Sequence, residues 1–338
     1  QVRCMRRILL MWMGMVVVVV VTAQDPHFSQ FFSSPLTLNP AFTGKFFGTY
    51  RVAGNYRNQW PTINNAFTSA TASVDFQVMQ NKMSQGDSWG VGFMGFNDNS
   101  SNGAVQFNYG TFSTAYHKSL DEDGMHQIGL GVQATYANML INTSSLNFED
   151  QLTTAGFTGL TSEIFNSSTL KSSYVDLNAG LLYNGSTNNR NNFYFGVSMY
   201  HINRPKQSFT GAEYLLKPRT NIHAGTYFPI GATTTLHLSG SQSFQAQVSQ
   251  TIIGGAIELN ATPDEPNSTS IYVGAWMRLK DALIPYVGIE FNNIRIGASY
   301  DYNTSSLRTA SINRGGIEVS LIYIRRPNTD RPVNCPKF

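Results

Sequence analysis

The chain has 338 residues, of which 41% are hydrophobic but only 13% are charged, against about 25% charged residues in soluble domains. Lys and Arg number 23 against 20 Asp and Glu, and three of the arginines lie within residues 1–23, so from residue 24 on the balance is 20 minus 20. A charge near zero gives no support for nucleic-acid binding, and no apolar run after residue 23 is long enough for a membrane-spanning helix.

Residues 5–23 read MRRILLMWMGMVVVVVVTA and have the three parts of a secretory signal peptide. A basic pair (Arg6, Arg7) precedes an apolar region at 8–21 and a small-residue cleavage site. The apolar region is shorter than the ~20 residues of a membrane span, so we expect residues 1–23 to be removed. Residues 1–4 precede the first methionine, and whether they are translated is left open. Cys335 would then be the only cysteine, which leaves no partner for an intramolecular disulfide.

Residues 24–47 form an apolar segment between the signal peptide and the first predicted strand. The stretch DPHFSQFFSSPLTLNPAFTG (25–44) is rich in aromatic residues and proline, and its Asn39-Pro40 pair favours a turn. Removing so much apolar surface from water requires a surface to pack against. The segment is therefore expected to be bound to something, not to hang free.

Alternation of apolar and polar residues with a period of two recurs through the rest of the chain and predicts β-strands. In QIGLGVQATYAN (127–138), Ile128, Leu130 and Val132 share one face, and Gly, Gln and Thr residues share the other. We predict about fourteen strands, most of about 9–13 residues, the length that crosses a bilayer when a strand is tilted. They span residues 48–57, 66–78, 88–97, 104–118, 126–141, 171–183, 191–201, 219–229, 233–243, 246–261, 269–279, 282–291, 294–303 and 314–325.

These strands predict an all-β fold, namely an up-and-down antiparallel transmembrane β-barrel of the outer-membrane type over residues 48–325. Unpaired backbone amides in lipid cost several kcal/mol each, so the sheet is expected to close. An even strand count puts both ends of the barrel sequence on one side. We assign the periplasm to that side, with segment 24–47 and a tail (326–338) also there and the long connection at 142–170 outside the cell. A soluble β-sandwich is the alternative, which long strands with apolar outward faces and scarce charge disfavour.

Five charged residues fall on the polar face of the predicted strands and are expected to line the lumen. They are Glu258, Glu290, Arg295, Asp301 and Glu318. Glu290 and Arg295 flank the tight Asn292-Asn293 turn, so they should pair across the hairpin. An ion-pair network that fills a narrow lumen is favoured over a channel selectivity ring, because both signs of charge are present.

No motif in the chain predicts catalysis, a metal site or a cofactor. Gly90 to Gly95 fits the dinucleotide-binding pattern G-x-G-x-x-G, but that motif needs a following helix, whereas here it lies inside an alternating strand. Its glycines are expected to give barrel curvature or room in the lumen. The six histidines have no metal-ligand spacing, and Cys335 has no assignable base.

Several local motifs together resemble the PorP/SprF family of type IX secretion system outer-membrane proteins, found in Bacteroidetes, over essentially the whole sequence after the signal peptide. The motifs are QDPHFSQFFSSPLTLNPAFTG (24–44), NYRNQWP (55–61), NFEDQL (147–152), HINRPKQSF (201–209), KPRTNIHAG (217–225), DALIPYVGIEFNNIRIGASYDY (281–302) and CPKF (335–338). The first two are specific in combination, whereas each motif alone would be weak.

The resemblance implies a non-enzymatic barrel without cofactors that assists export or surface attachment of cargo, such as gliding adhesins. Its implied partners are periplasmic and outer-membrane secretion components, the cargo itself and outer-membrane lipid. Two roles are then open for the apolar segment: a plug or lid against the periplasmic mouth of the barrel, or a docking strip for a secretion partner. The residues expected to dock are His27, Phe28, Phe31, Phe32, Cys335, Pro336 and Phe338. A small-solute porin and a secreted adhesive β-protein are the alternative functions.

Overall fold

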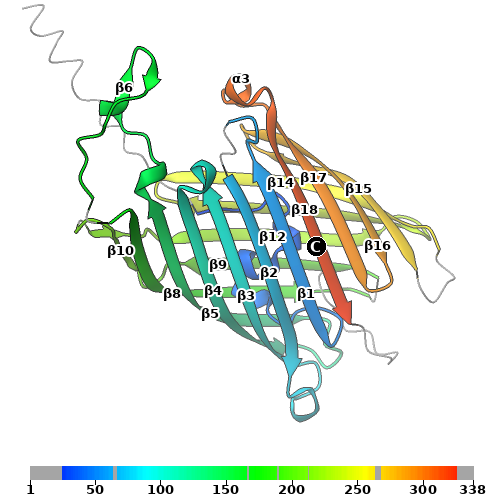
Figure 1. Cartoon of the computed structure of the whole chain (residues 1–338). Helices are drawn as coiled ribbons and strands as arrows, with labels where there is room; N and C mark the ends of the chain where they lie inside the picture. Colours follow the sequence, from blue (N-terminus) through cyan, green and yellow to red (C-terminus); the bar gives the residue numbers. More distant parts are fainter. Residues whose placement is uncertain are drawn as a thin grey trace, which may run out of the picture.

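The computed structural model describes residues 25–63, 67–165, 167–188, 190–211, 213–262 and 268–325. Long strands form one closed antiparallel barrel, in which β1 (Tyr50–Gln59) pairs with β18 (Arg314–Arg325) to complete the ring (Figure 1). The predicted barrel is therefore confirmed. Among the residues described, no helix is both long enough and apolar enough to cross a membrane.

Fourteen strands make up the barrel, as the sequence predicts. Besides β1 and β18 they are β2 (Phe67–Val78), β3 (Ser88–Ser100), β4 (Val105–Ser119), β5 (Gln127–Asn142), β8 (Thr169–Gly185), β9 (Asn192–Tyr200), β12 (Arg219–Pro229), β13 (Thr234–Gln245), β14 (Val248–Asn260), β15 (Thr269–Arg278), β16 (Ala282–Phe291) and β17 (Ile294–Asn303). The largest departure from the predicted limits is at β3, expected to end at residue 97 and observed to end at residue 100.

The two faces of the barrel wall follow the alternation in the sequence. On β5, the outward side chains of Leu130 and Val132 are 57% and 50% exposed, whereas the inward Gln133 is 4% exposed. The pattern recurs along the other strands, so the wall presents apolar side chains outward and mostly polar or small ones inward. An apolar outer band is what contact with lipid requires.

The two ends of the barrel differ in the length of their connections. One end, called the loop end, carries the 143–168 and 201–218 connections and the 304–313 connection with α3 (Arg308–Ser311). The other, called the turn end, carries shorter turns such as Asn292-Asn293. Small elements in the connections at both ends are β6 (Leu152–Thr153), β7 (Gly156–Phe157), β10 (Lys206–Ser208), β11 (Glu213–Leu215), η3 (Gln80–Lys82), η4 (Ser101–Gly103), η5 (Thr143–Ser145) and η6 (Glu149–Gln151).

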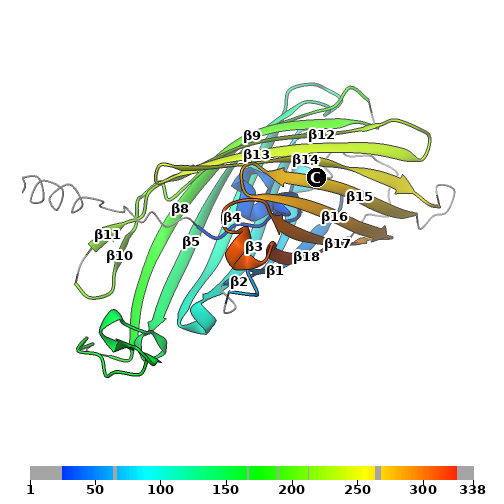
Figure 2. The same ribbon diagram turned by 90° about the horizontal axis from the view of Figure 1, so that it is seen from above.

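Residues 25–47 lie inside the barrel and are called the plug. They form three short helical turns, namely η1 (Phe31–Ser33), α2 (Pro35–Leu38) and η2 (Pro40–Phe42). Figure 2 shows this blue segment enclosed by the strands. Asn39 accepts a hydrogen bond from the amide of Ala41 and so caps the start of η2, as the Asn-Pro turn signal predicts.

The position of the plug differs from the expectation that segment 24–47 lies outside the barrel on the side where β1 begins. Asp25 contacts Arg219 and Gln245, which lie at the loop end, whereas the plug leads into β1 at the turn end. The first described residue and the end of β18 are therefore at opposite ends of the barrel. An even number of strands places the start of β1 and the end of β18 on the same side of the membrane, but it does not predict the path of a segment that runs through the lumen.

Glycines on the inner face of the wall leave room for the plug backbone. A Cβ atom added at Gly90 would overlap the carbonyl group of Thr43, and one added at Gly131 would overlap the backbone at Pro40 and Ala41. A Cβ at Gly95, by contrast, would meet no atom within 4 Å. Gly90 is the first glycine of the apparent dinucleotide motif, so its role here is close packing inside a strand.

Substituting Gly90 with Ala is expected to push the plug away from β3 and lower the free energy of unfolding by about 1–3 kcal/mol, the usual cost of overpacking. The measurement is the denaturation midpoint of the purified protein, with protease sensitivity of residues 25–47 as a second readout. Gly95→Ala, on the same strand, is the matched control and should behave as wild type. Equal effects of the two substitutions would contradict the close fit between plug and wall.

Candidate functional site: the plugged lumen

Asp25 fixes the plug at the loop end of the barrel. Its carboxylate lies 2.8 Å from Nε2 of His201 and 3.4 Å from the guanidinium of Arg219, and its backbone amide donates to Gln245 over 2.9 Å. Nδ1 of His201 lies 3.0 Å from the carboxylate of Asp176. Burial disfavours the charged imidazole, but the two carboxylates outweigh it and raise the pKa of His201 to about 9.

Glu318 binds the next part of the plug through backbone amides. Its two carboxylate oxygens accept hydrogen bonds from the amides of Ser29 and Gln30, over 2.7 and 2.9 Å. The Gln30 side chain donates to the hydroxyl of Ser299 over 3.0 Å and accepts from the hydroxyl of Ser320 over 2.6 Å. All of these groups are buried, so each bond satisfies a polar group that water cannot reach.

Asp301 joins the plug to two arginines of the wall. Its carboxylate lies 2.9 Å from Arg57 and 2.6 Å from Arg278, and it accepts a hydrogen bond from the Ser29 hydroxyl over 2.8 Å. Arg57 also lies 3.9 Å from Glu318 and donates to the carbonyl of His27. The arrangement alternates positive and negative groups, which is what allows four charges to be buried together.

The structure brings together two of the predicted lumen charges, Asp301 and Glu318, but their arginine partners were not among the predicted residues. Arg57 lies on β1, far from β17 and β18 in sequence, and Arg278 lies on β15, two strands before β17. Only the inward position of each residue in its own strand could have indicated them, because the pairing depends on the order of strands around the barrel.

The other predicted lumen charges pair on neighbouring strands. Glu290 and Arg295 lie opposite each other across the β16–β17 hairpin, with 2.7 Å between carboxylate and guanidinium. The Glu290 carboxylate also accepts from the hydroxyl of Tyr272 over 3.0 Å. Glu258 lies 2.8 Å from Nε2 of His237. Acids and bases thus alternate along this wall, with no ring of one sign among the five predicted residues.

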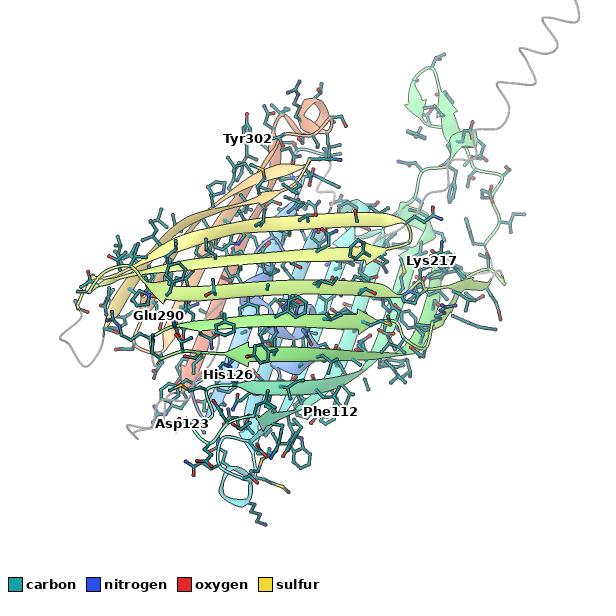
Figure 3. All side chains as sticks on the ribbon, turned by 180° about the vertical axis from the view of Figure 1, so that it is seen from behind. Phe112, Asp123, His126, Lys217, Glu290 and Tyr302 are labelled. Carbon is teal, nitrogen blue, oxygen red and sulfur yellow. The ribbon has the colours of Figure 1, made fainter. Side chains whose placement is uncertain are left out.

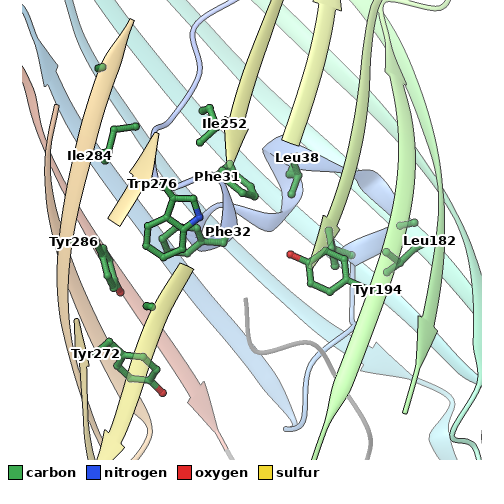
Figure 4. Packing of buried hydrophobic residues seen from close by; sticks show 14 residues of the cluster. Phe31, Phe32, Leu38, Leu182, Tyr194, Ile252, Tyr272, Trp276, Ile284 and Tyr286 are labelled. Atoms are coloured by element: carbon green, nitrogen blue, oxygen red, sulfur yellow. The ribbon is translucent and has the colours of Figure 1, made fainter. Parts of the chain in front are cut away.

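Aromatic side chains of the plug pack against aromatic side chains of the wall (Figure 4). The ring centroid of Phe32 lies 4.4 Å from that of Trp276 and 5.4 Å from that of Tyr286, and Phe42 lies 5.6 Å from Tyr194. Large buried aromatic groups of this kind dominate core energetics. The main apolar core of the molecule is therefore the contact between plug and wall.

Of the residues expected to dock a partner, Phe28, Phe31 and Phe32 are 4%, 6% and 8% exposed inside the barrel, and His27 is half-buried beside them. The barrel wall covers these three phenylalanines in this structure. Cys335, Pro336 and Phe338 lie outside the described residues. The docking role of these residues stays a prediction.

The plug is fixed again at the turn end, just before β1. The carboxylate of Asp75 accepts from the amide of Gly44 over 2.8 Å and lies 2.8 Å from the guanidinium of Arg51. Arg51 in turn donates to the carbonyl of Phe42 over 3.1 Å. The plug is thus held at the loop end, in its middle and at the turn end.

The described part of the chain was predicted to have no metal-ligand spacing among its histidines, and its side chains form no metal-binding cluster. No group of three or more His, Cys, Asp and Glu side chains there could hold a metal ion. The arrangement of charges and aromatics in the lumen is suited to holding a segment in place, since many of its polar groups bind the plug or each other.

Replacing Asp301 with Asn is expected to lower the free energy of unfolding by about 3–5 kcal/mol, because it leaves Arg57 and Arg278 buried without their shared carboxylate. Chemical denaturation of the refolded barrel measures this change.

For Glu290 and Arg295, the double substitution to Gln and Met should lower the free energy of unfolding by less than the sum of the two single substitutions. Strict additivity across that cycle would remove the argument for a coupled pair.

The anchor at His201 should make stability depend on pH. Its pKa in the folded protein, about 9, lies above the ordinary 6.5, so the stabilisation is complete below pH 6.5 and is lost as pH rises through 9. We expect the melting temperature to fall between pH 6.5 and 9.5, and to fall less in His201→Gln. His126→Gln, at the turn end, is the control, and an unchanged pH profile in His201→Gln would contradict the anchor.

Comparison with known proteins identifies the family of the chain. The family model described as type IX secretion system membrane protein PorP/SprF matches residues 20–323. No curated protein gives a significant match. Solved structures that resemble this one include the toluene transporter TbuX of Ralstonia pickettii, with 12% identity, a TM-score of 0.47, and coverage of 87% of this chain and 93% of that one.

A FadL homologue of Pseudomonas aeruginosa has 10% identity, a TM-score of 0.44, and coverage of 84% of this chain and 92% of that one. At these identities the likeness concerns the barrel fold alone. The family match covers nearly the whole barrel and points to a non-enzymatic outer-membrane protein that associates with other components of its secretion system. The chain belongs to the PorP/SprF family of type IX secretion system membrane proteins.

Proposed function

We propose that this protein is a plugged, non-conducting barrel that serves type IX secretion as a scaffold, assisting export or surface attachment of cargo proteins such as adhesins. The observation that carries the proposal is the plug, whose aromatic side chains pack against the wall while its backbone is bound by Glu318 and Asp75. A solute channel needs a continuous water-filled path through the lumen. The plug blocks such a path, because it is held at the loop end, in its middle and at the turn end. The alternative function of a small-solute porin is therefore disfavoured.

The plug role is also favoured over the docking role for residues 25–47. A partner could reach Phe31 and Phe32 only if they left their contacts with Trp276 and Tyr286. Burying one such side chain stabilises by roughly 1.5–3 kcal/mol, so release would need a partner that replaces these contacts. We place partner binding on the outer surfaces of the barrel ends, with periplasmic components at the turn end and cargo at the loop end.

Planar-bilayer recordings test the scaffold proposal. The wild-type protein is expected to show no steady single-channel conductance, whereas deletion of residues 25–38 should produce open channels because it removes most of the plug. Gly95→Ala serves as the control for handling and refolding. Stable conductance of the wild-type protein would overturn the proposal and restore the porin function.

Cysteine labelling tests the orientation. Leu160 is 97% exposed in the 143–168 connection, and Glu122 is exposed in a turn at the opposite end. With the loop end outside the cell, an impermeant maleimide added to intact cells should label Leu160→Cys but not Glu122→Cys. Both should be labelled after the outer membrane is opened. Labelling of Glu122→Cys alone in intact cells would reverse the assignment.

A further inference from the structure

The lumen is not filled completely at the loop end. A cavity of about 540 Å³ lies between the plug and the loops, and Asp25, Pro26 and His27 contribute to its lining. Aromatic groups form much of the rest: Trp60, Phe67, Phe107, Tyr174 and Tyr214. A volume of this size, with mainly apolar walls and a few polar groups, is typical of a ligand site.

One carboxyl group on the cavity wall differs from every other buried acid in the described structure. Asp98, on β3, is 8% exposed and accepts a hydrogen bond from the Ser69 hydroxyl, but it forms no ion pair among the described residues. Arg57 acts on it only at longer range and is bound to Asp301. The other buried acids each lie beside an arginine or a histidine: Asp75, Asp176, Glu258, Asp301 and Glu318.

The remaining polar groups of the cavity do not supply the missing positive charge. Burial holds the pKa of His27 well below its ordinary value, so that ring is neutral. Lys217 is exposed at the cavity rim beside β11 (labelled in Figure 3) and forms no ion pair with Asp98. The negative charge of Asp25 is already met by Arg219 and His201.

Trp60 is held on the cavity wall by its backbone. Its φ of 54° lies in the left-handed region, which is unfavourable for a bulky side chain, and its amide donates to the carbonyl of Gly315 over 2.8 Å. Its ring packs edge-on against that of Phe67 with 5.6 Å between centroids. Strain of this kind persists only where the surroundings enforce it, and here it sets an indole at the cavity wall.

We propose that this cavity is a binding site for a cationic group, an ammonium or a guanidinium, carried on an apolar or aromatic body. Asp98 would pair with the positive charge, and the aromatic walls would contact both the body and the cation, which aromatic faces attract. The ligand could be a free amine or the Arg or Lys side chain of a peptide, since both offer this chemistry. The site goes beyond the scaffold function and does not depend on whether the barrel conducts.

The first test uses the full mature protein in lipid nanodiscs, with phenethylammonium as the cationic probe and 2-phenylethanol as its neutral match. Calorimetry reports binding, and so does the change in tryptophan fluorescence, to which Trp60 on the cavity wall contributes. The cation is expected to bind at least about tenfold more tightly than the alcohol, as a buried charge-assisted hydrogen bond would give. Asp98→Asn should abolish this preference, and Glu122→Gln, which removes a distant exposed acid, should leave it unchanged.

A second variant keeps the test decisive if Asp98→Asn folds poorly. Tyr214 is 47% exposed on β11, so Tyr214→Ala should leave the barrel intact while it removes part of the aromatic wall. It is expected to weaken binding of both probes several-fold without changing their ratio. Equal affinity for the two probes in the wild-type protein, or a preference that survives in Asp98→Asn, would overturn the proposal.

A second pair of probes in the same experiment distinguishes a peptide side chain from a free amine as the ligand. The capped peptide acetyl-Phe-Arg-Phe-amide is compared with the version in which citrulline, a neutral isostere, replaces arginine. A preference for arginine that Asp98→Asn removes assigns the site to peptide side chains. Binding of phenethylammonium alone assigns it to a small amine, and binding of neither probe overturns the site.

Discussion

The bonds from the backbone amides of Ser29 and Gln30 to the buried carboxylate of Glu318 are the interaction on which the plug depends. They set the start of η1 against β18 and so direct Phe32 onto Trp276. A carboxylate enclosed in protein is costly unless its lone pairs are satisfied. Glu318 finds its partners in the plug and in Arg57, which means that the wall is electrostatically complete only with the plug in place.

The barrel has little apolar core without this segment. Its outward side chains face the membrane, and much of its inner face is formed by Ser, Thr, Gln, Asn and Gly. The buried apolar cluster consists of plug side chains, such as Leu38 and Phe42, together with inward wall residues, such as Leu182 and Tyr194. Hydrogen bonding within the sheet closes the barrel, whereas apolar burial inside it comes from the plug. The two are therefore parts of one folded unit.

The sequence predicted the wall well because each strand carries its own evidence. Alternation in QIGLGVQATYAN (127–138) is a local pattern, and the inward and outward faces of β5 follow from it. The Glu290–Arg295 contact could be predicted for the same reason, since a tight turn brings the two residues opposite each other. Local patterns thus settled the strands, their faces and the pairing across hairpins.

What lies inside the barrel could not be predicted in the same way. The composition of residues 25–44 indicated that they must pack against something, but the surface they contact is built from strands throughout the chain. Arg57 meets Asp301 only because the barrel closes between β1 and β18, and Arg278 on β15 meets it from the far side of β16. The plug starts at the loop end and enters β1 at the turn end. This path cannot be predicted from the number of strands.

The buried acids on the inner wall are of two kinds. Asp75, Asp301 and Glu318 each bind both an arginine and a group of the plug, so their cost of burial is offset within the fold. Asp98 lies on the same inner wall, yet the plug passes below it and leaves a cavity at its side chain. Asp98 is a buried carboxyl group in a cavity that is also lined by five aromatic side chains, and no cation of the described residues forms an ion pair with it. The plug therefore both closes the barrel and forms the floor of a recess at its loop end, and that recess has the charge and shape to recognise a positively charged group.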